Sequence, residues 1–296
     1  MSRALRRAAV LGHPIAHSLS PVLHRAAYAD LGLSNWEYQR HDVQAEQLAD
    51  FVAGMDDSWA GLSLTMPLKY AALSLADHVD PQAEAVGAVN TLLRGPGGLL
   101  TAANTDVYGL TAALGEVTTP GHTAQHAVIV GGGATACSAL AALGELGIHS
   151  PVVLARSLQR VGAVHRAASK MGTEPQFRQW DGPEVPRLLR SADIVLSTVP
   201  QYAADGLAAH LHGTRLQEHQ VLLDVVYADW PTAVASAWQE AGGTIAPGHL
   251  MLLHQGVEQV RLMTGRPGPV EPMRRALLNA ISGHEGQAPS TARLPG

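Results

Sequence analysis

The stretch that decides the fold is Val128-Ile129-Val130-Gly131-Gly132-Gly133-Ala134-Thr135-Ala136. An apolar run typical of a buried strand leads directly into a glycine turn, and a helical pattern follows over residues 134–146. The turn fits G-x-G-x-x-G/A, with Ala136 at the third small position. This arrangement is typical of a strand and a helix that bind the pyrophosphate of a dinucleotide between them.

Each small residue of the turn has a physical reason. The first glycine permits the tight turn, the second lets a pyrophosphate approach the backbone, and the third residue lets helix and strand pack closely. A tight turn without a ligand is the alternative, but the flanking strand and helix favour binding. We therefore expect the cofactor to contact Gly131, Gly132, Gly133, Ala134, Thr135 and Ala136.

The end of the next expected strand, residues 152–155, indicates which dinucleotide is bound. An NAD site usually has Asp or Glu there for the ribose 2′-hydroxyl, but this chain has Ala155-Arg156-Ser157 and then Arg160. A guanidinium can bind a 2′-phosphate bidentately and stack on adenine. We therefore expect NADP, with Arg160 able to share the role of Arg156. An ordinary solvated Arg156 is the alternative, but it leaves the missing acid unexplained.

Outward from this centre, strand-like runs alternate with helical segments. The expected strands are residues 8–11, 60–65, 88–93, 127–130, 152–155, 194–198 and 221–226. The expected helices include residues 21–31, 44–55, 134–146, 251–262 and 272–281. Strands that alternate with helices predict parallel sheets in an α/β fold.

A segment at residues 117–126, with Thr118, Thr119, Pro120 and Gly121, separates the two halves of this pattern. We expect a first domain over residues 1–116 and a Rossmann-type, NADP-binding domain over residues 117–245. The last helical stretches occupy residues 246–283. Residues 284–296 are rich in Gly, Pro, Ser and Ala, and we expect a disordered tail there.

Two ionisable residues in the first half stand out from their surroundings. Lys69 follows the run Leu62-Ser63-Leu64-Thr65-Met66, and Asp106 follows Leu99-Leu100-Thr101-Ala102-Ala103. A cation and a carboxylate that share one cleft can transfer a proton to and from a hydroxyl. The alternatives without a catalytic role are a lysine in a surface loop and an aspartate that caps a helix N-terminus. With the glycine turn, the pair favours a dinucleotide-dependent oxidoreductase that acts on an alcohol or a ketone.

Two serines lie just after the first expected strand, in Gly12-His13-Pro14-Ile15-Ala16-His17-Ser18-Leu19-Ser20-Pro21. Ser20 can cap the helix that Pro21 opens. Alternatively, Ser18 and Ser20 bind a carboxylate near that helix N-terminus, where the helix dipole favours an anion.

With these motifs in place, the sequence closely resembles the shikimate dehydrogenase family. The resemblance runs from Gly12 to about Arg275. Besides the serine segment and the glycine turn, it rests on Thr65-x-Pro67-x-Lys69, Gly87-Ala88-Val89-Asn90-Thr91, Asn104-Thr105-Asp106-x-x-Gly109 and Gly248-x-x-Met251-Leu252-x-x-Gln255. The family reduces 3-dehydroshikimate to shikimate with NADPH, reversibly, in aromatic amino-acid and chorismate biosynthesis. It has an N-terminal substrate domain and a Rossmann domain, and its last helices return to the first domain.

The resemblance also implies roles for single residues. Ser18 and Ser20 would bind the substrate carboxylate, Thr65, Asn90 and Gln255 the ring hydroxyls, and Lys69 and Asp106 would be the catalytic pair. Tyr227 would line the substrate side. Further contacts to the cofactor would come from Ser157, Thr198, Val199, Gly248 and Met251.

The chain departs from the family pattern at three places. Ser63 stands where Asn is frequent, and we expect it to support the loop rather than bind substrate. Ala155-Arg156-Ser157 replaces Asn-Arg-Thr, which removes one expected hydrogen bond on the adenosine side. Ser197-Thr198-Val199-Pro200 replaces a frequent Asn-Ala/Thr-x-Gly, so backbone contacts near the nicotinamide differ.

Composition limits the remaining choices. The 296 residues suffice for two domains, and 46% apolar with 15% charged residues indicates a folded protein. A net charge of -5 without basic tracts argues against a nucleic-acid partner, and no apolar run is long enough for a membrane span. The single Cys137 fits a reducing compartment, so we expect the cytoplasm. His17 and His24 lack a third ligand at metal spacing, so we expect no metal.

Two alternatives to a shikimate dehydrogenase stay open at this point. One is a quinate/shikimate or aminoshikimate dehydrogenase with a broader substrate range or with NAD. The missing acid near Arg156 argues against NAD. The other is a non-catalytic sensor of shikimate or nucleotide, which would not need Lys69 and Asp106. The oligomeric state, a homodimer included, is also left open.

Overall fold

The structure is a computed structural model, and it describes residues 4–285. Its first sheet has the strand order β2-β1-β3-β5-β6-β4. The strands are β1 (Arg6–Gly12), β2 (Trp36–Asp42), β3 (Trp59–Leu64), β4 (His78–Val79), β5 (Thr91–Arg94) and β6 (Leu100–Ala103). The helices that accompany it are α1 (Ser20–Asp30), α2 (Leu48–Ala53) and α3 (Pro81–Val86).

The second sheet has the order β12-β11-β10-β7-β8-β9, and all its paired strands are parallel. The strands are β7 (Ala127–Val130), β8 (Val152–Ala155), β9 (Gln176–Gln179), β10 (Ile194–Ser197), β11 (Val221–Asp224) and β12 (Thr244–Pro247). Its helices are α5 (Ala134–Glu145), α6 (Gly162–Met171), α7 (Val185–Ser191) and α8 (Ala233–Glu240). Counted from β7, this order is 3-2-1-4-5-6 read from β9, the doubly wound Rossmann arrangement.

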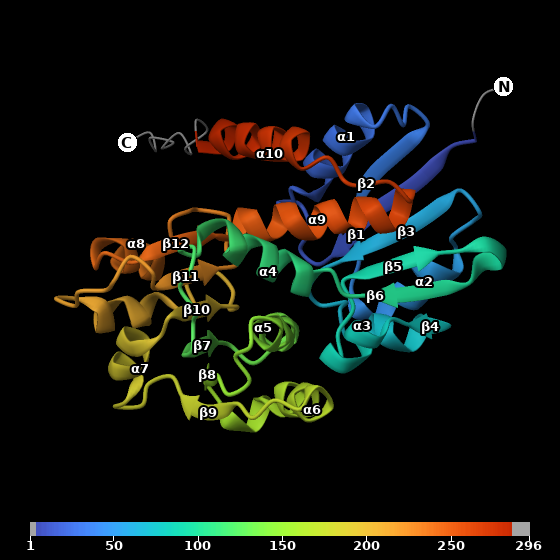
Figure 1. Cartoon of the computed structure of the whole chain (residues 1–296). Helices are drawn as coiled ribbons and strands as arrows, with labels where there is room; N and C mark the ends of the chain where they lie inside the picture. The colour runs from blue at the N-terminus through green and yellow to red at the C-terminus, as the bar shows by residue number, and fades with distance from the viewer. Residues whose placement is uncertain (1–3, 286–296) are drawn as a thin grey trace, which may run out of the picture.

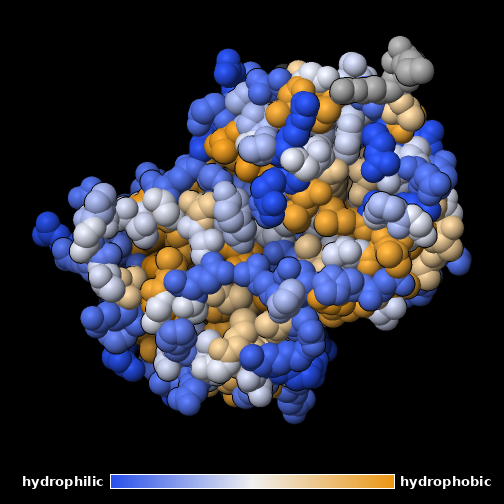
Figure 2. All heavy atoms as spheres, turned by 45° about the vertical axis from the view of Figure 1, so that its right-hand side comes forward, coloured by the Kyte–Doolittle hydropathy of each residue, from blue (hydrophilic) through white to orange (hydrophobic). Residues whose placement is uncertain are grey.

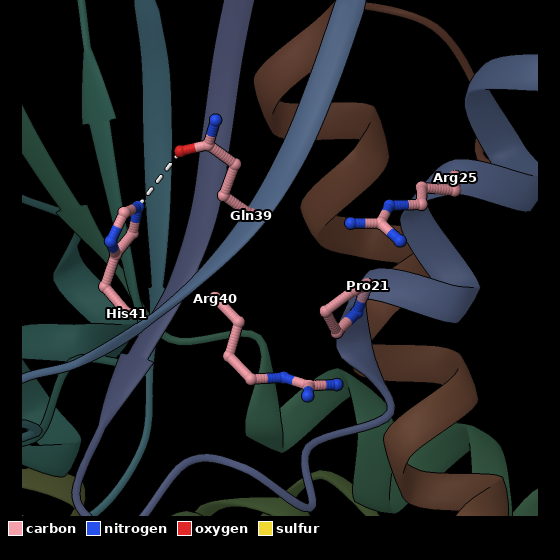
Figure 3. Close-up of a pocket in the computed structure, with 5 residues that line it drawn as sticks. All are labelled: Pro21, Arg25, Gln39, Arg40 and His41. Atoms are coloured by element: carbon pink, nitrogen blue, oxygen red, sulfur yellow. Dashed lines mark hydrogen bonds between the residues drawn. The ribbon is translucent and has the colours of Figure 1, made fainter.

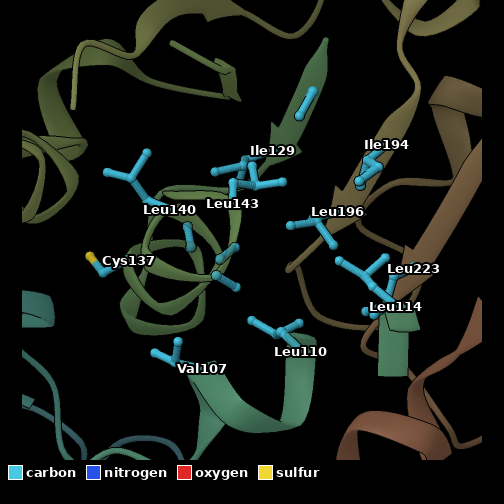
Figure 4. Close-up of a cluster of buried hydrophobic side chains, with 14 of the residues drawn as sticks. Val107, Leu110, Leu114, Ile129, Cys137, Leu140, Leu143, Ile194, Leu196 and Leu223 are labelled. Atoms are coloured by element: carbon cyan, nitrogen blue, oxygen red, sulfur yellow. The ribbon is translucent and has the colours of Figure 1, made fainter. Parts of the chain in front are cut away.

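Two helices, α4 (Asp106–Val117) and α9 (Gly248–Thr264), run between the two sheets (Figure 1). The last helix, α10 (Val270–Glu285), packs on α1 and α9. The apolar side chains of α4 point at the second sheet, where Leu110 and Leu114 join Ile129 and Leu196 in one buried cluster (Figure 4). Short 3-10 segments complete the chain at Ala45–Gln47, Ala71–Leu75, Pro96–Gly98, Leu158–Arg160 and Asp205–Leu211.

The last two helices return to the first part of the chain, as the family resemblance implies. Leu253 and Val260 of α9 are buried with Leu23 of α1 and with Met273 of α10. The helix α9 therefore begins beside the second sheet and ends against the first (Figure 1). The space-filling view shows two lobes that meet at a waist, with apolar side chains exposed on both sides of it (Figure 2).

The α/β fold with a Rossmann-type unit is confirmed, and two of the predicted strands, β7 and β8, have the predicted bounds. The expectation of parallel sheets is wrong for β5, which runs antiparallel to both β3 and β6. The strands that were not predicted are β2, β4, β6, β9 and β12. Most are short or carry polar side chains at a sheet edge, and such segments lack the apolar run that reveals a buried strand.

The sheets change between Ala103 and Ala127, an interval that contains the expected boundary at residue 117. That boundary stays a prediction, because α4 lies inside the interval and packs on the second sheet. The expected tail at residues 284–296 lies outside the described residues, except that residues 284 and 285 belong to the last turn of α10.

Candidate active site

Lys69 and Asp106, which are 37 residues apart in sequence, meet in the folded chain. Lys69 Nζ lies 2.5 Å from Asp106 Oδ2, and the side chains are 14% and 1% exposed. A charge-assisted hydrogen bond of this kind is shorter and stronger than one between neutral groups. The Lys69 side chain thus keeps a small exposed fraction, while the carboxylate of Asp106 is enclosed.

The backbone around Lys69 is anchored on both sides. Leu68 is fully buried in the core of the first sheet, and its N–H donates to the carbonyl oxygen of Thr65 at 2.8 Å. The carbonyl oxygen of Lys69 accepts the N–H of Val89, also at 2.8 Å. The turn after β3 therefore directs the lysine toward Asp106 rather than leaving it on a free loop.

Asp106 begins α4, but its carboxylate does not cap the helix. The side chain of Asn104 takes that role, because its Oδ1 accepts the N–H of Asp106 at 2.9 Å and of Val107 at 3.4 Å. The amide of Asn104 in turn donates to the carbonyl oxygen of Ala88. Both oxygens of Asp106 are thereby left for Lys69 and Asn90. The N-cap interpretation of Asp106 is therefore wrong. The capping side chain is that of Asn104, two residues earlier.

Asn90 joins the catalytic candidates to each other. Its Nδ2 lies 2.8 Å from Asp106 Oδ1 and 3.1 Å from Gln255 Oε1, and its Oδ1 accepts the N–H of Thr105 at 2.8 Å. The residue is 1% exposed. A buried amide with partners on both its oxygen and its nitrogen has one favourable orientation.

Gln255 reaches this group because α9 packs closely on α4 at a glycine. A Cβ at Gly109 would lie 2.9 Å from the carbonyl oxygen of Met251 and 3.1 Å from the Cβ of Gln255. Real Cβ atoms are not found so near a backbone oxygen, so a larger residue would push the helices apart. Gly109, part of the motif that carries Asp106, thus also sets the position of Gln255.

A second layer of buried polar groups supports the first. Gln259 lies one turn beyond Gln255, and its Nε2 donates to Thr91 Oγ1 at 3.1 Å, while its Oε1 accepts the hydroxyl of Ser63 at 2.8 Å. Tyr38 donates to that same Ser63 oxygen at 2.6 Å. Ser63 therefore links β2 to α9, and its expected support of the loop stays a prediction. Gln259 and Tyr38 were not predicted, because single polar residues in a helix or an edge strand carry no motif.

His24 closes this buried network. Its Nε2 lies 3.3 Å from Gln259 Oε1, and its ring stacks on Tyr38 with 3.9 Å between the centroids. Burial lowers the pKa of His24 to about 3, and the hydrogen bond to Gln259 only partly opposes that shift. The histidine is therefore neutral at physiological pH.

The two serines lie at the start of α1, where both are buried. Ser18 Oγ accepts the N–H of Ser20 at 3.4 Å, and Ser20 is the first residue of α1 rather than its N-cap. Tyr227 approaches from the second part of the chain and packs in the same apolar cluster as Leu19. Burial raises the pKa of Tyr227, and the nearby charge of Arg40 opposes this shift.

An open hollow of about 400 Å³ lies beside the serine segment, and Lys69 does not line it. It is lined by Pro21, Arg25, Gln39, Arg40 and His41. Figure 3 shows Arg25 and Arg40 extending into this hollow from α1 and β2.

On the nucleotide side, the glycine turn follows β7. Gly131 has a φ of +126°, and a Cβ at this residue would collide with Thr198. The N–H of Gly131 donates to the carbonyl oxygen of Leu154 at 2.8 Å, and Thr198 Oγ1 donates to that of Val130 at 2.9 Å. The turn thus needs glycine for its backbone conformation and for the close approach of the loop after β10. Val199 follows Thr198 in that loop.

Arg156, at the end of β8, is exposed, and its guanidinium carbon lies 5.4 Å from the ring centre of Trp180. Ser157 and the exposed Arg160 follow it. No acidic residue lies among residues 155–160. Trp180, directly after β9, was not predicted from sequence. Its aromatic ring beside the guanidinium of Arg156 favours one position of that group.

Gly248 and Met251 lie at the start of α9. A Cβ at Gly248 would collide with the backbone of Val225, so this glycine lets α9 begin against the end of β11. Met251 is 5% exposed and packs in the cluster of the second sheet. Both positions have a packing role in the structure, and their contact with a nicotinamide stays a prediction.

Comparisons with known proteins point to one family. The family profile described as shikimate dehydrogenase substrate binding domain matches residues 10–92, and the profile described as Shikimate 5'-dehydrogenase C-terminal domain matches residues 248–278. A shikimate dehydrogenase (NADP(+)) of Methanopyrus kandleri is 34% identical over 276 residues, which are 92% of this chain and 94% of the relative.

Solved structures are similar over nearly the whole chain. The shikimate dehydrogenase of Mycobacterium tuberculosis is 40% identical with a TM-score of 0.83, and the match covers 93% of this chain and 99% of that one. The enzyme of Thermus thermophilus in complex with NADP(H) and shikimate is 30% identical with a TM-score of 0.77, and the match covers 93% and 100% of the two chains.

Proposed function

The chain belongs to the shikimate dehydrogenase family, and we propose that Lys69 and Asp106 are the residues that carry its reaction. The reaction is the reversible NADPH-dependent reduction of 3-dehydroshikimate to shikimate. The broader quinate or aminoshikimate activity is not favoured. A purely regulatory role would leave the Lys69–Asp106 pair, whose carboxylate is buried and also bonded to Asn90, without a purpose.

We assign the substrate to the cleft in front of this pair. Ser18 and Ser20 bind its carboxylate at the start of α1, with Tyr227 closing the same end. Thr65, Asn90 and Gln255 bind the ring hydroxyls. This assignment is supported by the burial of the serines and by the bond from Asn90 to Gln255. It places polar groups from three parts of the chain around one small, polyhydroxylated acid.

Lys69 is the proton donor in the reduction. Its ammonium donates a hydrogen bond to the carbonyl oxygen, stabilises the negative charge that develops there and transfers a proton to it. Asp106 and Asn90 hold the amine in place, so little reorganisation is needed. Because 14% of the Lys69 side chain is exposed, solvent can return the proton after the reaction.

The residues of the nucleotide side fit NADP. The glycine turn offers a backbone cradle that a side chain at Gly131 would fill, and Arg156 offers an exposed guanidinium where an acid would be needed for NAD. When bound, NADPH supplies the hydride to the carbonyl carbon. Gly131 to Ala136 would hold the pyrophosphate, Arg156, Ser157 and Arg160 the 2′-phosphate, and Thr198, Val199, Gly248 and Met251 the nicotinamide side.

The single observation that carries the proposal is the hydrogen bond from Lys69 Nζ to Asp106 Oδ2, held by Asn90. The test is a set of initial rates for shikimate and quinate, each with NADP and with NAD. We expect shikimate with NADP to give the highest kcat/KM. Equal rates with NAD would contradict the role of Arg156, and no turnover of shikimate with either cofactor would contradict the function.

We also propose a location and an assembly for the chain. Within residues 4–285, no helix is both long and apolar enough to cross a membrane. The one cysteine, Cys137, is buried, and we keep the cytoplasm as the proposed location and a homodimer as the proposed assembly. The net charge of -5 supports the absence of a nucleic-acid partner. Light scattering of the purified chain tests the dimer directly.

A further inference from the structure

Three side chains of metal-ligand type gather at the amino ends of the strands in the second sheet. The glycine turn lies at the opposite ends of these strands. His122 lies between α4 and β7, Asp193 precedes β10 and His219 precedes β11. The Nε2 atoms of the two histidines lie 3.6 and 3.8 Å from the same oxygen, Asp193 Oδ1. One ligand atom from each residue lies within 4.8 Å of the others.

The carboxylate of Asp193 is held in place from behind. Its Oδ2 accepts the backbone N–H of Gln125 at 2.8 Å and of His126 at 2.9 Å, which leaves Oδ1 facing the two imidazoles. A carboxylate that is oriented by bonds to its other oxygen is well placed to act as a metal ligand.

The distances fit a shared cation better than direct pairing of the side chains. At 3.6 and 3.8 Å neither imidazole is within hydrogen-bond distance of the carboxylate, although both approach the same oxygen. The two rings are 4.1 Å apart between centroids, so two protonated imidazoles would repel each other. Ligand atoms on a tetrahedral Zn²⁺ lie about 3.3 Å apart, so small side-chain movements would complete the site.

We propose that His122, Asp193 and His219 bind one divalent late transition-metal ion such as Zn²⁺, with water in the remaining position. Two imidazoles and a carboxylate are a usual ligand set for this class of ion. The site lies at the amino ends of β7, β10 and β11, whereas the glycine turn lies at the carboxyl end of β7. Its role is therefore structural: it ties the segment between the two sheets to the second sheet. The inference stands without the proposed function.

The first test measures Zn²⁺ affinity on the chelator-treated full-length protein by competition with a chromophoric chelator. We expect one Zn²⁺ per chain, with affinity at least about tenfold weaker in His122→Ala and in His219→Ala. His149→Ala removes an exposed histidine of the same half of the chain and is the matched control, with affinity unchanged. No binding, or binding kept in both site variants, would overturn the proposal.

A second readout separates the site from other histidines. A ligand that binds only the folded state raises the Tm. Zn²⁺ should therefore raise the Tm of the parent protein and of His149→Ala, and leave His122→Ala and His219→Ala unchanged. In the metal-free state the kcat of all three variants should equal that of the parent. An equal rise of the Tm in all four proteins would place the ion elsewhere and contradict the proposal.

A different observation concerns Arg40, in the hollow shown in Figure 3. Its guanidinium donates to the carbonyl oxygens of Ala16 at 2.7 Å and Ser18 at 2.5 Å, and so ties β2 to the serine segment. Arg25, in the same hollow, instead donates to the carbonyl oxygen of Tyr38 at 3.0 Å. We infer that Arg40 is a positioning residue that holds Ser18 for the substrate carboxylate, an inference that rests on the proposed function.

The pair of arginines supplies its own control. Arg40→Ala should raise the KM for shikimate about tenfold with little change in kcat, because Ser18 would lose the contact that holds it in place. A tenfold rise corresponds to about 1.4 kcal/mol of substrate binding. Arg40→Lys should recover part of the loss, and Arg25→Ala should keep the parent KM. An unchanged KM in Arg40→Ala, or an equal rise in Arg25→Ala, would overturn the role. An inactive parent enzyme would instead contradict the proposed function.

Discussion

The substrate side and the nucleotide side of the molecule are built in different ways. On the substrate side, Lys69, Asp106 and Asn90 are held by hydrogen bonds to each other, and a second buried layer around Gln259 supports them. On the nucleotide side, the structure offers the backbone of a glycine turn and an exposed Arg156 against Trp180. The difference indicates that the substrate side holds its polar groups through hydrogen bonds within the chain, while the nucleotide side offers backbone groups and an exposed guanidinium.

This contrast divides the expected effects of substitutions. A change on the substrate side should alter kcat, the KM for shikimate or the free energy of unfolding, because buried polar groups lose partners there. A change on the nucleotide side should alter cofactor affinity and leave the fold intact.

The largest effect is expected for Lys69→Ala. General acid catalysis contributes about two to four decades in rate, so kcat should fall by that amount while the KM for NADPH stays near that of the parent. Steady-state rates with 3-dehydroshikimate provide the measurement. A variant that keeps the parent kcat would contradict the role of Lys69 in the mechanism. An equally large loss of NADPH binding would contradict the division between the substrate side and the nucleotide side.

His24 should make stability depend on pH. Its pKa is about 3 in the folded state, against an ordinary value of 6.5, so the unfolded chain binds more protons between these two pH values. The stabilisation is complete above pH 6.5 and is lost as the pH falls toward about 3. At about 1.4 kcal/mol per pKa unit, the shift corresponds to about 4–5 kcal/mol.

The measurement is urea unfolding between pH 4 and 8 of the parent and of His24→Phe, which keeps a ring against Tyr38 but cannot titrate. The difference in the free energy of unfolding between the two proteins should shift in favour of the variant as the pH falls. A difference that is constant with pH would mean that His24 titrates normally.

A smaller effect is expected on the nucleotide side. Arg156→Ala should weaken NADP binding by about one to two decades and leave NAD unchanged, because a hydrogen bond to a charged group contributes about 1.5–3 kcal/mol. Binding of both cofactors is measured by titration. Trp180→Ala should give part of the loss, and Arg160→Ala shows how much of the role is shared. Equal weakening of NAD and NADP would place Arg156 away from the 2′-phosphate.

The smallest effect concerns the serines. Ser18→Ala should raise the KM for shikimate about tenfold, the lower end for a hydrogen bond to a charged group, with NADP affinity kept. The double variant with Ser20→Ala should raise it further. Shikimate methyl ester should bind poorly to the parent. An ester that turns over as well as the acid would mean that the serines do not bind the carboxylate.

The sequence predicted the elements that have a local sequence pattern. It missed the elements that depend on contacts between distant segments. The run from Val128 to Ala136 predicted β7, the turn and α5, because strand, glycine and helix signals are adjacent. The edge strand β2 was missed because its polar residues hide its strand period. The antiparallel β5 was missed because direction depends on the loops rather than on the strand itself.

The site shows the same division. The resemblance named Lys69, Asp106 and Asn90, and the structure brings these three together. The support from Gln259 and His24 is invisible in the sequence, because a buried glutamine or histidine is recognised only by its partners across the fold. The cluster of His122, Asp193 and His219 was missed for that reason too, since its members are 71 and 26 residues apart in sequence.

The central claim is that the ammonium of Lys69 supplies the proton, and chemical rescue tests it most directly. The rate of NADPH oxidation with 3-dehydroshikimate is measured for Lys69→Ala at rising concentrations of methylammonium, with Arg156→Ala as the control. We predict that methylammonium raises the rate of Lys69→Ala toward saturation and does not raise that of Arg156→Ala. A Lys69→Ala enzyme that binds both substrates yet gains nothing from the amine, or that needs no rescue because its kcat equals that of the parent, would contradict the account.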